Sequence, residues 1–197
     1  MNYQAATLGR DSALILVDVQ KDFCPGGSLA VREGDQVVPV LNRYAESFEK
    51  AGAAVFATRD WHPKNHCSFK AQGGPWPPHC IQDSAGAEFH PDFRLPFNGI
   101  VISKAVRPEA DAYSGFEGTN LELYLKRRGI KRVFVGGLAT DYCVKQTVLD
   151  ARRLGFDAYL LIDAVRGVDA KKGDSEKAIE EMEKSGAIPV TLQEIQK

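Results

Sequence analysis

The sequence predicts an α/β fold in three layers, with a central, mostly parallel sheet of about six strands and helices on both faces. Short runs that are apolar on both faces recur along the chain, which is typical of strands buried inside a parallel sheet. Amphipathic stretches of helical length separate most of these runs, as in a succession of βαβ units. A length of 197 residues suits one domain, so we expect a single domain over residues 1–197.

The expected strands are six short apolar runs. They cover Ala13–Val19, Ala53–Thr58, Gly99–Ser103, Arg132–Gly136, Ala158–Ile162 and Ala187–Leu192. The expected helices are four stretches with apolar residues at helical spacing. They cover Gln36–Lys50, Thr119–Arg128, Thr140–Leu154 and Ser175–Lys184. A glycine follows each of these stretches within two residues, which is a common way for a helix to end.

Polar residues at the helix starts are the expected N-caps. Asp35 precedes the first helix, and Thr140 opens the third. Thr119 and Glu122 have the spacing of a capping box, in which each side chain bonds the backbone N–H of the other residue. With Thr140 as the N-cap, Cys143 is expected in the first turn of its helix.

The charge balance argues against strongly charged partners. Lys and Arg number 25 against 26 Asp and Glu, so we expect neither nucleic acid nor a membrane surface as a partner. The first apolar run, Ala13–Val17, is too short to cross a bilayer and is followed by Asp18. Four cysteines are too few for a disulfide scaffold. These features predict a soluble, cytoplasmic protein.

The stretch from about residue 60 to residue 96 breaks the alternation and is expected to be a metal-binding insertion. A loop this long inside a compact domain is usually functional. Asp60 and His62 project to the same side of an extended backbone, and the loop brings in His66 or His79. Carboxylate and imidazole ligands suit Zn²⁺, Fe²⁺ or Mn²⁺ rather than Ca²⁺.

Two alternatives to this metal site remain open at the level of sequence. The histidines can simply pack or form hydrogen bonds inside the fold. Alternatively, Cys67 and Cys80 can join histidines in a closed structural zinc site, which keeps no position open for water.

Polar residues end or follow several of the expected strands. Asp18, Asp60 and Lys104 come at or just after the ends of the first three, and the fourth leads through a glycine pair to Cys143. Because ligands bind outside the carboxyl ends of strands in parallel α/β sheets, we expect these four side chains to converge on one edge.

Cys143 is the candidate nucleophile of such a site. The start of a helix favours an anion, which predicts a lowered pKa for the thiol, and Lys104 would act in the same direction. Asp18 could accept the thiol proton and pass it to a leaving group. The glycine-containing turn before Cys143 lets backbone N–H groups approach a substrate oxyanion. For Cys24, Cys67 and Cys80 we expect burial without a chemical role.

Five motifs together make the sequence resemble a known family. They are Leu16–Phe23, Asp60–Phe69, Trp76–Cys80, Asp111–Phe116 and Gly137–Val144, in this order along nearly the whole chain. On these residues the chain resembles the nicotinamidase branch of the isochorismatase-like cysteine hydrolases. The resemblance implies the isochorismatase-like form of the α/β fold, and a cis peptide bond between Leu138 and Ala139.

The resemblance also implies roles for residues at the matching positions. Asp18, Lys104 and Cys143 match the catalytic triad of the family, and the backbone N–H groups of Ala139 and Cys143 match its oxyanion hole. Phe23 matches an aromatic residue that stacks on the substrate ring.

Further residues match the family's binding positions. Trp76 matches the second aromatic residue around the ring, and Tyr113 is a further expected substrate-binding residue. The expected metal ligands are Asp60, His62 and His79, joined in some members of the family by His66.

The implied activity is the hydrolysis of nicotinamide to nicotinate and ammonia through a thioester on the cysteine. The implied cofactor is one divalent transition metal, with zinc expected first and iron or manganese as alternatives. Pyrazinamide is a further candidate substrate, and homo-oligomer formation stays open. The alternatives are a related amidase for a carbamoyl or ureido substrate and, in a different class, a non-catalytic zinc-stabilised interaction domain.

Overall fold

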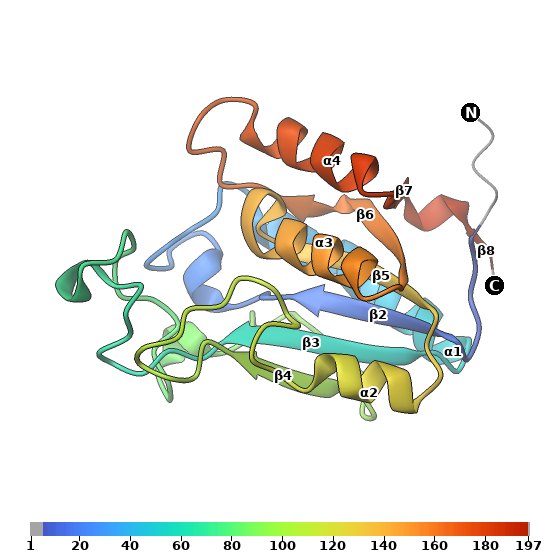
Figure 1. Cartoon of the computed structure of the whole chain (residues 1–197), viewed down its shortest axis with the longest axis horizontal. Coiled ribbons are helices and arrows are strands. Elements are labelled where there is room, and N and C mark those ends of the chain that lie inside the picture. The colour runs from blue at the N-terminus through green and yellow to red at the C-terminus, as the bar shows by residue number, and fades with distance from the viewer. Residues whose placement is uncertain (1–5, 197) are drawn as a thin grey trace.

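The computed structural model describes residues 6–196 and shows a parallel sheet of six strands in the order β4-β3-β2-β5-β6-β7 (Figure 1). The strands are β2 (Ser12–Val17), β3 (Ala54–Asp60), β4 (Ile100–Lys104), β5 (Arg132–Leu138), β6 (Asp157–Arg166) and β7 (Ile188–Val190). Every neighbouring pair runs parallel. The expected α/β fold with a six-stranded central sheet is therefore confirmed.

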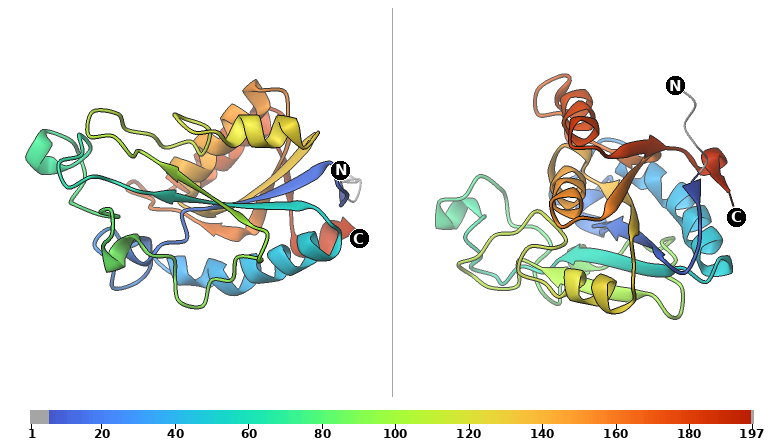
Figure 2. Two further views of the ribbon diagram at one scale, coloured as in Figure 1. Left: turned by 90° about the horizontal axis from the view of Figure 1, so that it is seen from below. Right: turned by 45° about the vertical axis from the view of Figure 1, so that its right-hand side comes forward.

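Helices cover both faces of this sheet (Figure 2). One face packs against α1 (Val37–Lys50), and the other packs against α2 (Leu121–Arg127), α3 (Lys145–Arg153) and α4 (Asp174–Lys184). A separate pair of short parallel strands, β1 (Ala6–Thr7) and β8 (Ile195–Gln196), joins the two ends of the described chain. Within residues 6–196, no helix combines the length and apolar character needed to cross a bilayer.

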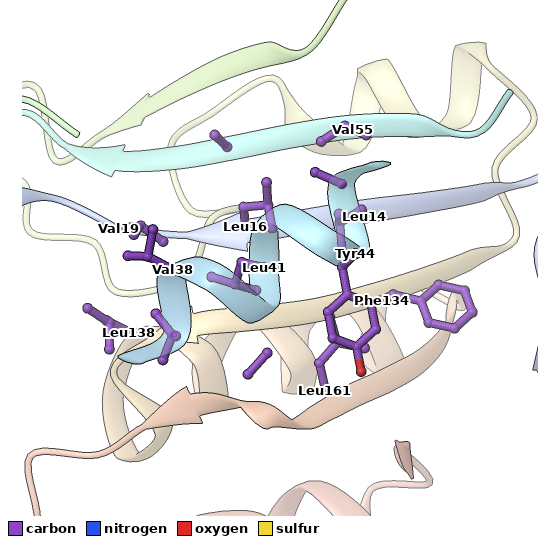
Figure 3. Close-up of a cluster of buried hydrophobic side chains, with 14 of the residues drawn as sticks. Leu14, Leu16, Val19, Val38, Leu41, Tyr44, Val55, Phe134, Leu138 and Leu161 are labelled. Atoms are coloured by element: carbon purple, nitrogen blue, oxygen red, sulfur yellow. The ribbon is translucent and has the colours of Figure 1, made fainter. Parts of the chain in front are cut away.

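The central strand β2 shows why the sheet needs helices on both sides. Leu14 and Leu16 face α1, whereas Ala13, Ile15 and Val17 face the opposite layer, and all five are fully buried (Figure 3). Burying one such aliphatic side chain contributes about 1.5–3 kcal/mol. A strand that is apolar on both faces is therefore stable only between two helical layers.

The expected caps of the first and second helices differ from those in the structure. The first helix begins at Val37, after a 3-10 turn that already contains Asp35, and it has no side-chain cap. The hydroxyl of Thr119 accepts the backbone N–H of Leu121 at 3.2 Å and donates to the carbonyl of Gly115, whereas Glu122 pairs with Lys126 one turn further along α2. Thr119 and Glu122 therefore do not form the expected reciprocal capping box. In both cases a local turn precedes the helix and shifts the cap position.

The long segment between β3 and β4 contains the 3-10 turns Lys70–Gln72 and Ala85–Ala87 and lies at the carboxyl ends of the strands. Gln20, which is fully buried, ties it to the sheet. The Gln20 side chain donates one hydrogen bond to the carbonyl of Asp60 and another to that of Ala87. The segment that carries the histidines is thus fixed against the sheet edge.

We expect Tyr44→Phe to lower the free energy of unfolding by about 1.5–3 kcal/mol, as for a hydrogen bond to a charged group. The buried Tyr44 hydroxyl donates to Asp163 Oδ1 at 2.7 Å, joining α1 to β6. Urea unfolding measures the change. The matched control is Tyr159→Phe, whose ring stacks on Phe134 and whose hydroxyl makes no hydrogen bond within residues 6–196. Equal stability losses in the two variants would contradict this role of the Tyr44 hydroxyl.

Candidate active site

Four chemically active side chains meet where the strand order reverses. Asp60 and Lys104 are the last residues of β3 and β4, Asp18 directly follows β2, and Cys143 lies in the turn after β5. From β2 the chain continues to β3 and β4 on one side of the sheet, then crosses back to β5 on the other side of β2 and continues to β6 and β7. Such a reversal opens a crevice at the carboxyl edge of a parallel sheet. The expected convergence of these four residues is therefore confirmed.

Gly137, near the end of β5, brings two of these strand ends close together. Its φ is +127°, and a Cβ atom there would lie 2.1 Å from the carbonyl oxygen of Val17. A side chain at this position would push β5 away from β2. The peptide bond that follows, between Leu138 and Ala139, is cis, as the resemblance implied.

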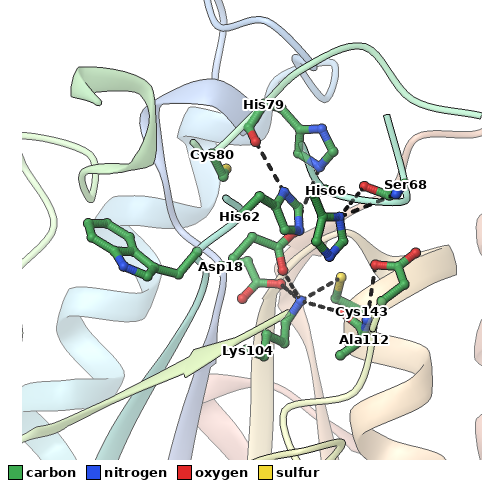
Figure 4. Close-up of polar contacts among 12 residues, drawn as sticks. Asp18, His62, His66, Ser68, His79, Cys80, Lys104, Ala112 and Cys143 are labelled. Atoms are coloured by element: carbon green, nitrogen blue, oxygen red, sulfur yellow. Dashed lines mark hydrogen bonds and ion pairs between the residues drawn. The ribbon is translucent and has the colours of Figure 1, made fainter. Parts of the chain in front are cut away.

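Lys104 forms the centre of the site (Figure 4). Its Nζ lies 3.0 Å from Asp18 Oδ2 and 3.5 Å from Cys143 Sγ, and it donates hydrogen bonds to Asp60 Oδ1 and to the carbonyl of Ala112. Burial alone would lower the pKa of Lys104, but the two carboxylates outweigh burial and raise that pKa well above its ordinary value. The side chain is therefore a fully buried ammonium ion.

Asp18 is placed to exchange a proton with Cys143. Its Oδ1 accepts a hydrogen bond of 2.6 Å from the Thr58 hydroxyl, while Oδ2 is buried without a well-directed hydrogen bond. One oxygen each of Asp18 and Asp60 and the Sγ of Cys143 all lie within 4.8 Å of one another. Burial raises the pKa of Asp18, and the nearby Lys104 ammonium opposes that rise. A carboxyl group with a raised pKa is suited to take up and release a proton.

The pKa of Cys143 differs from the sequence expectation. Burial raises the pKa of this thiol well above its ordinary value. The Lys104 ammonium opposes that rise, whereas the charges of Asp18 and Asp60 add to it. The expected N-cap is also wrong, because Thr140 lies inside a π turn (Thr140–Val144) that follows Ala139. The resting sulfur is therefore a neutral thiol that must lose its proton when it attacks.

Asp60, His62 and His79 offer three donor atoms to a metal ion. The Nε2 atoms of both histidines lie 3.9 Å from Asp60 Oδ2. Each Nδ1 contacts a backbone carbonyl, that of His79 at 3.1 Å from His62 and that of Pro77 at 2.8 Å from His79. A carbonyl only accepts hydrogen bonds, so Nδ1 carries the proton and Nε2 presents its lone pair to the metal position.

The protonation of His62 suits the same role. Burial lowers the pKa of His62 to about 4, although Asp60 acts against that shift, so the ring is neutral at pH 7. A neutral imidazole is the form that binds a metal. One carboxylate and two imidazoles fit a divalent transition metal and leave coordination positions free for water or substrate.

His66 lies beside these donors but belongs to a different group. Its ring stacks on that of His62 at 4.2 Å, with Nδ1 2.7 Å from the Ser68 hydroxyl and Nε2 3.2 Å from the carbonyl of Ala110. Its donor atom groups with those of His62 and Asp111, not with Asp60 and His79. Both of its nitrogens already have hydrogen-bond partners.

Cysteines take no part in the donor groups around these histidines. Among the described residues, neither Cys67 nor Cys80 belongs to a group of potential metal ligands. Cys24 and Cys80 are buried and Cys67 is half-buried, and all are free thiols. The geometry therefore favours an open metal site over a closed structural zinc site.

A small cavity of about 50 Å³ opens beside Cys143. Its volume holds roughly three to five water molecules, which corresponds to one small ring with a short substituent. The lining is mostly apolar and aromatic. It comprises Phe23, Leu29, Val31, Asp60, Trp76, His79, Tyr113, Leu138, Ala139, Tyr142, Cys143 and Val168.

The expected substrate-binding aromatics all line this cavity. The indole N–H of Trp76 donates to the Tyr113 hydroxyl at 2.9 Å, and the Trp76 ring meets that of Tyr142 edge-on at 5.3 Å. Phe23 packs against His79 with ring centroids 5.6 Å apart. Tyr142 was not expected from the sequence, although it directly precedes the candidate nucleophile.

Two further polar residues that support the site were also missed. The Gln20 side chain accepts the backbone N–H of Asp60 at 2.7 Å and donates to its carbonyl at 2.8 Å. It thus satisfies both backbone hydrogen-bonding groups of Asp60, as the backbone of a paired strand would. Thr58 orients Asp18. The sequence carried a signal for Thr58 alone, which is a polar residue within an otherwise apolar expected strand, whereas Gln20 lies beyond the end of β2.

Comparison with known proteins places the chain in a family. The family model for the isochorismatase domain matches residues 12–194, and the chain belongs to this family. It is 43% identical to the nicotinamidase of Escherichia coli strain K12, over 91% of this chain and 94% of that protein. It is 38% identical to the nicotinamidase of Acinetobacter baylyi, over 93% of this chain and 94% of that protein.

Solved structures give the same result. The pyrazinamidase of Pyrococcus horikoshii in complex with zinc aligns with a TM-score of 0.89 and 52% identity, covering 92% of this chain and 99% of that one. PnC1 from L. infantum in complex with nicotinate aligns with a TM-score of 0.90 and 37% identity, covering 98% of both chains. The resemblance to nicotinamidases that the five motifs carry is thus confirmed.

Proposed function

We propose that this protein is a cysteine amidohydrolase that converts nicotinamide to nicotinate and ammonia. The observation that carries the proposal is the position of Lys104, which brings Asp18 and Cys143 together at the base of a small aromatic cavity. The similarity to nicotinamidases over almost the whole chain supports it independently.

In the first half of the reaction, the Cys143 sulfur attacks the carboxamide carbon. The thiol proton passes to Asp18, whose carboxylate lies within 4.8 Å of the sulfur. The backbone N–H groups of Ala139 and Cys143 would stabilise the oxyanion, and one such donor is worth about 3 kcal/mol. Asp18 then returns the proton to the amide nitrogen, ammonia leaves, and a thioester on Cys143 remains.

In the second half, water hydrolyses the thioester. Asp18 is again a carboxylate and accepts a proton from the attacking water. The carbon–sulfur bond breaks, the proton returns to the sulfur, and nicotinate is released. Throughout both halves, the Lys104 ammonium balances the negative charge that moves between Asp18 and Cys143.

The remaining site residues bind and orient the substrate. Phe23, Trp76 and Tyr113 would enclose the pyridine ring, and pyrazinamide has the same flat shape. Asp60, His62 and His79 would hold one divalent metal, zinc first, beside the cavity, with His66 as a supporting neighbour. When bound, the metal would act as a Lewis acid for the ring nitrogen. An enclosed aromatic cavity favours a ring over the flexible carbamoyl or ureido substrates of related amidases.

We expect Cys143→Ala to reduce ammonia release from nicotinamide by at least roughly 10³-fold, because no other group in the cavity can form the thioester. A coupled ammonia assay measures the rate, and circular dichroism checks the fold. Cys67→Ala is the matched control, since this half-buried cysteine lies outside the cavity and should keep nearly full activity. If Cys143→Ala kept a tenth of the wild-type activity, Cys143 would not be the nucleophile.

We expect one zinc ion per wild-type chain and a loss of affinity of at least about 100-fold in His79→Ala, because this variant removes one of three ligands. Competition against a zinc-sensitive chelating dye measures the affinity. His90→Ala is the control, since His90 lies on the same segment but outside the donor groups. Equal zinc affinity in His79→Ala and wild type would show that this histidine is not a ligand.

A further inference from the structure

Asp141 joins the turn that carries the nucleophile to a distant segment. Its Oδ1 accepts the backbone N–H of Val168 and its Oδ2 accepts that of Asp169, both at 2.9 Å. Asp141 lies two residues before Cys143 in the π turn, whereas the two donors follow β6. One side chain therefore uses both of its oxygens to hold these two parts of the chain at a set separation.

The segment after β6 depends on such contacts because it has left the sheet. The backbone of Gly167 passes so close that a Cβ there would lie 3.2 Å from Asp141 Oδ1 and 1.8 Å from the Ser175 hydroxyl. On the other side, the Asp169 carboxylate accepts the N–H and the hydroxyl of Ser175, both at 2.8 Å. The segment is thus held to the nucleophile turn by Asp141 and to the start of α4 by Asp169.

Val168, which Asp141 holds through its backbone N–H, forms part of the cavity wall. Its side chain lines the cavity together with Ala139, Tyr142 and Cys143, which belong to or adjoin the same turn as Asp141. The distance between the Val168 wall and the nucleophile therefore depends on the two hydrogen bonds of Asp141. A cavity of about 50 Å³ leaves little space beyond one ring, so a small shift of this wall changes what fits.

We propose that Asp141 is a positioning residue that fixes the Val168 wall and thereby limits the size of the ring that the site accepts. The substrate class in this inference rests on the proposed function, whereas the contact between Asp141 and Val168 does not. Asp141 acts through Val168 and through the backbone of its own turn. It takes no part in bond making or breaking.

Hydrogen exchange tests the contact without using activity. In Asp141→Asn, the side-chain amide can accept only one of the two N–H groups, so we expect the peptide spanning residues 165–170 to exchange about tenfold faster. Asp174→Asn is the matched control, because Asp174 accepts the N–H of Lys171 in the same segment at 2.9 Å and does not line the cavity. The control should leave the exchange of Val168 and Asp169 unchanged. Equal exchange of this peptide in wild type and Asp141→Asn would overturn the proposal.

Kinetics test the consequence for ring size. We expect Asp141→Asn to raise KM for nicotinamide about tenfold with a change in kcat below about threefold, since the loss of one hydrogen bond corresponds to up to about tenfold in binding. The same variant should improve the ratio of kcat/KM for a ring-methylated nicotinamide to that for nicotinamide. Val168→Ala, which widens the wall directly, should shift this ratio in the same direction, and Asp174→Asn should not.

The role of Asp141 in ring selection and the proposed hydrolysis of nicotinamide can fail separately. An unchanged ratio in Asp141→Asn, together with a shifted ratio in Val168→Ala, would overturn the role of Asp141 in ring selection. Absence of nicotinamide hydrolysis in the wild type would instead refute the proposed function, and the exchange experiment would still decide whether Asp141 holds the segment.

Discussion

A single buried ammonium group determines how this site is built. Moving a charge out of water is costly, and a buried ion is stable only when opposite charges and hydrogen bonds surround it. Lys104 is 1% exposed and has Asp18, Asp60 and the carbonyl of Ala112 around its Nζ. The same ion thus holds together the ends of three neighbouring strands. It also explains why the proton-transfer group and the metal donors lie side by side. Lys104 contacts both Asp18, which transfers the proton, and Asp60, which is one of the metal donors.

The neutral state of the nucleophile follows from the same arrangement. Burial disfavours a charged sulfur, and the buried cation is already matched by two carboxylates, so a permanent thiolate would add a third negative charge with no further counterion. Transfer of the proton from Cys143 to Asp18 keeps the total charge of the group constant. Charge therefore moves within the buried site without a net change, and Lys104 contacts both the donor and the acceptor.

Most of the fold could be predicted from the sequence, because it depends on patterns within short stretches. The run Leu14–Val17 is apolar on both faces, and that property alone indicates a strand between two layers. Positions of the site residues at strand ends could be predicted for the same reason. The caps at Asp35 and Thr140 and the capping box of Thr119 and Glu122 were wrong because each depends on the turn at the start of the helix, where several backbone paths are compatible with the same residues.

The properties that could not be predicted depend on residues far apart in the chain. The pKa of Cys143 is raised first by burial and further by Asp18 and Asp60, against the effect of Lys104, and the local helix position reveals none of these influences. The partners of Asp141 lie 27 and 28 residues away, and those of Gln20 lie 40 and 67 residues away. Such contacts follow from the packing of the whole sheet edge and become visible only in three dimensions.

The free energy of unfolding of Lys104→Met, alone and combined with Asp18→Asn, tests the role of the buried ammonium most directly. Both variants and the wild type are unfolded in urea with chelator present, so that bound metal does not add to stability. Loss of the ammonium leaves two buried carboxylates unpaired and should lower the free energy of unfolding by about 3–5 kcal/mol. Adding Asp18→Asn removes one of these charges and should restore part of the loss. A Lys104→Met protein as stable as the wild type, or a double variant less stable than the single one, would contradict this account.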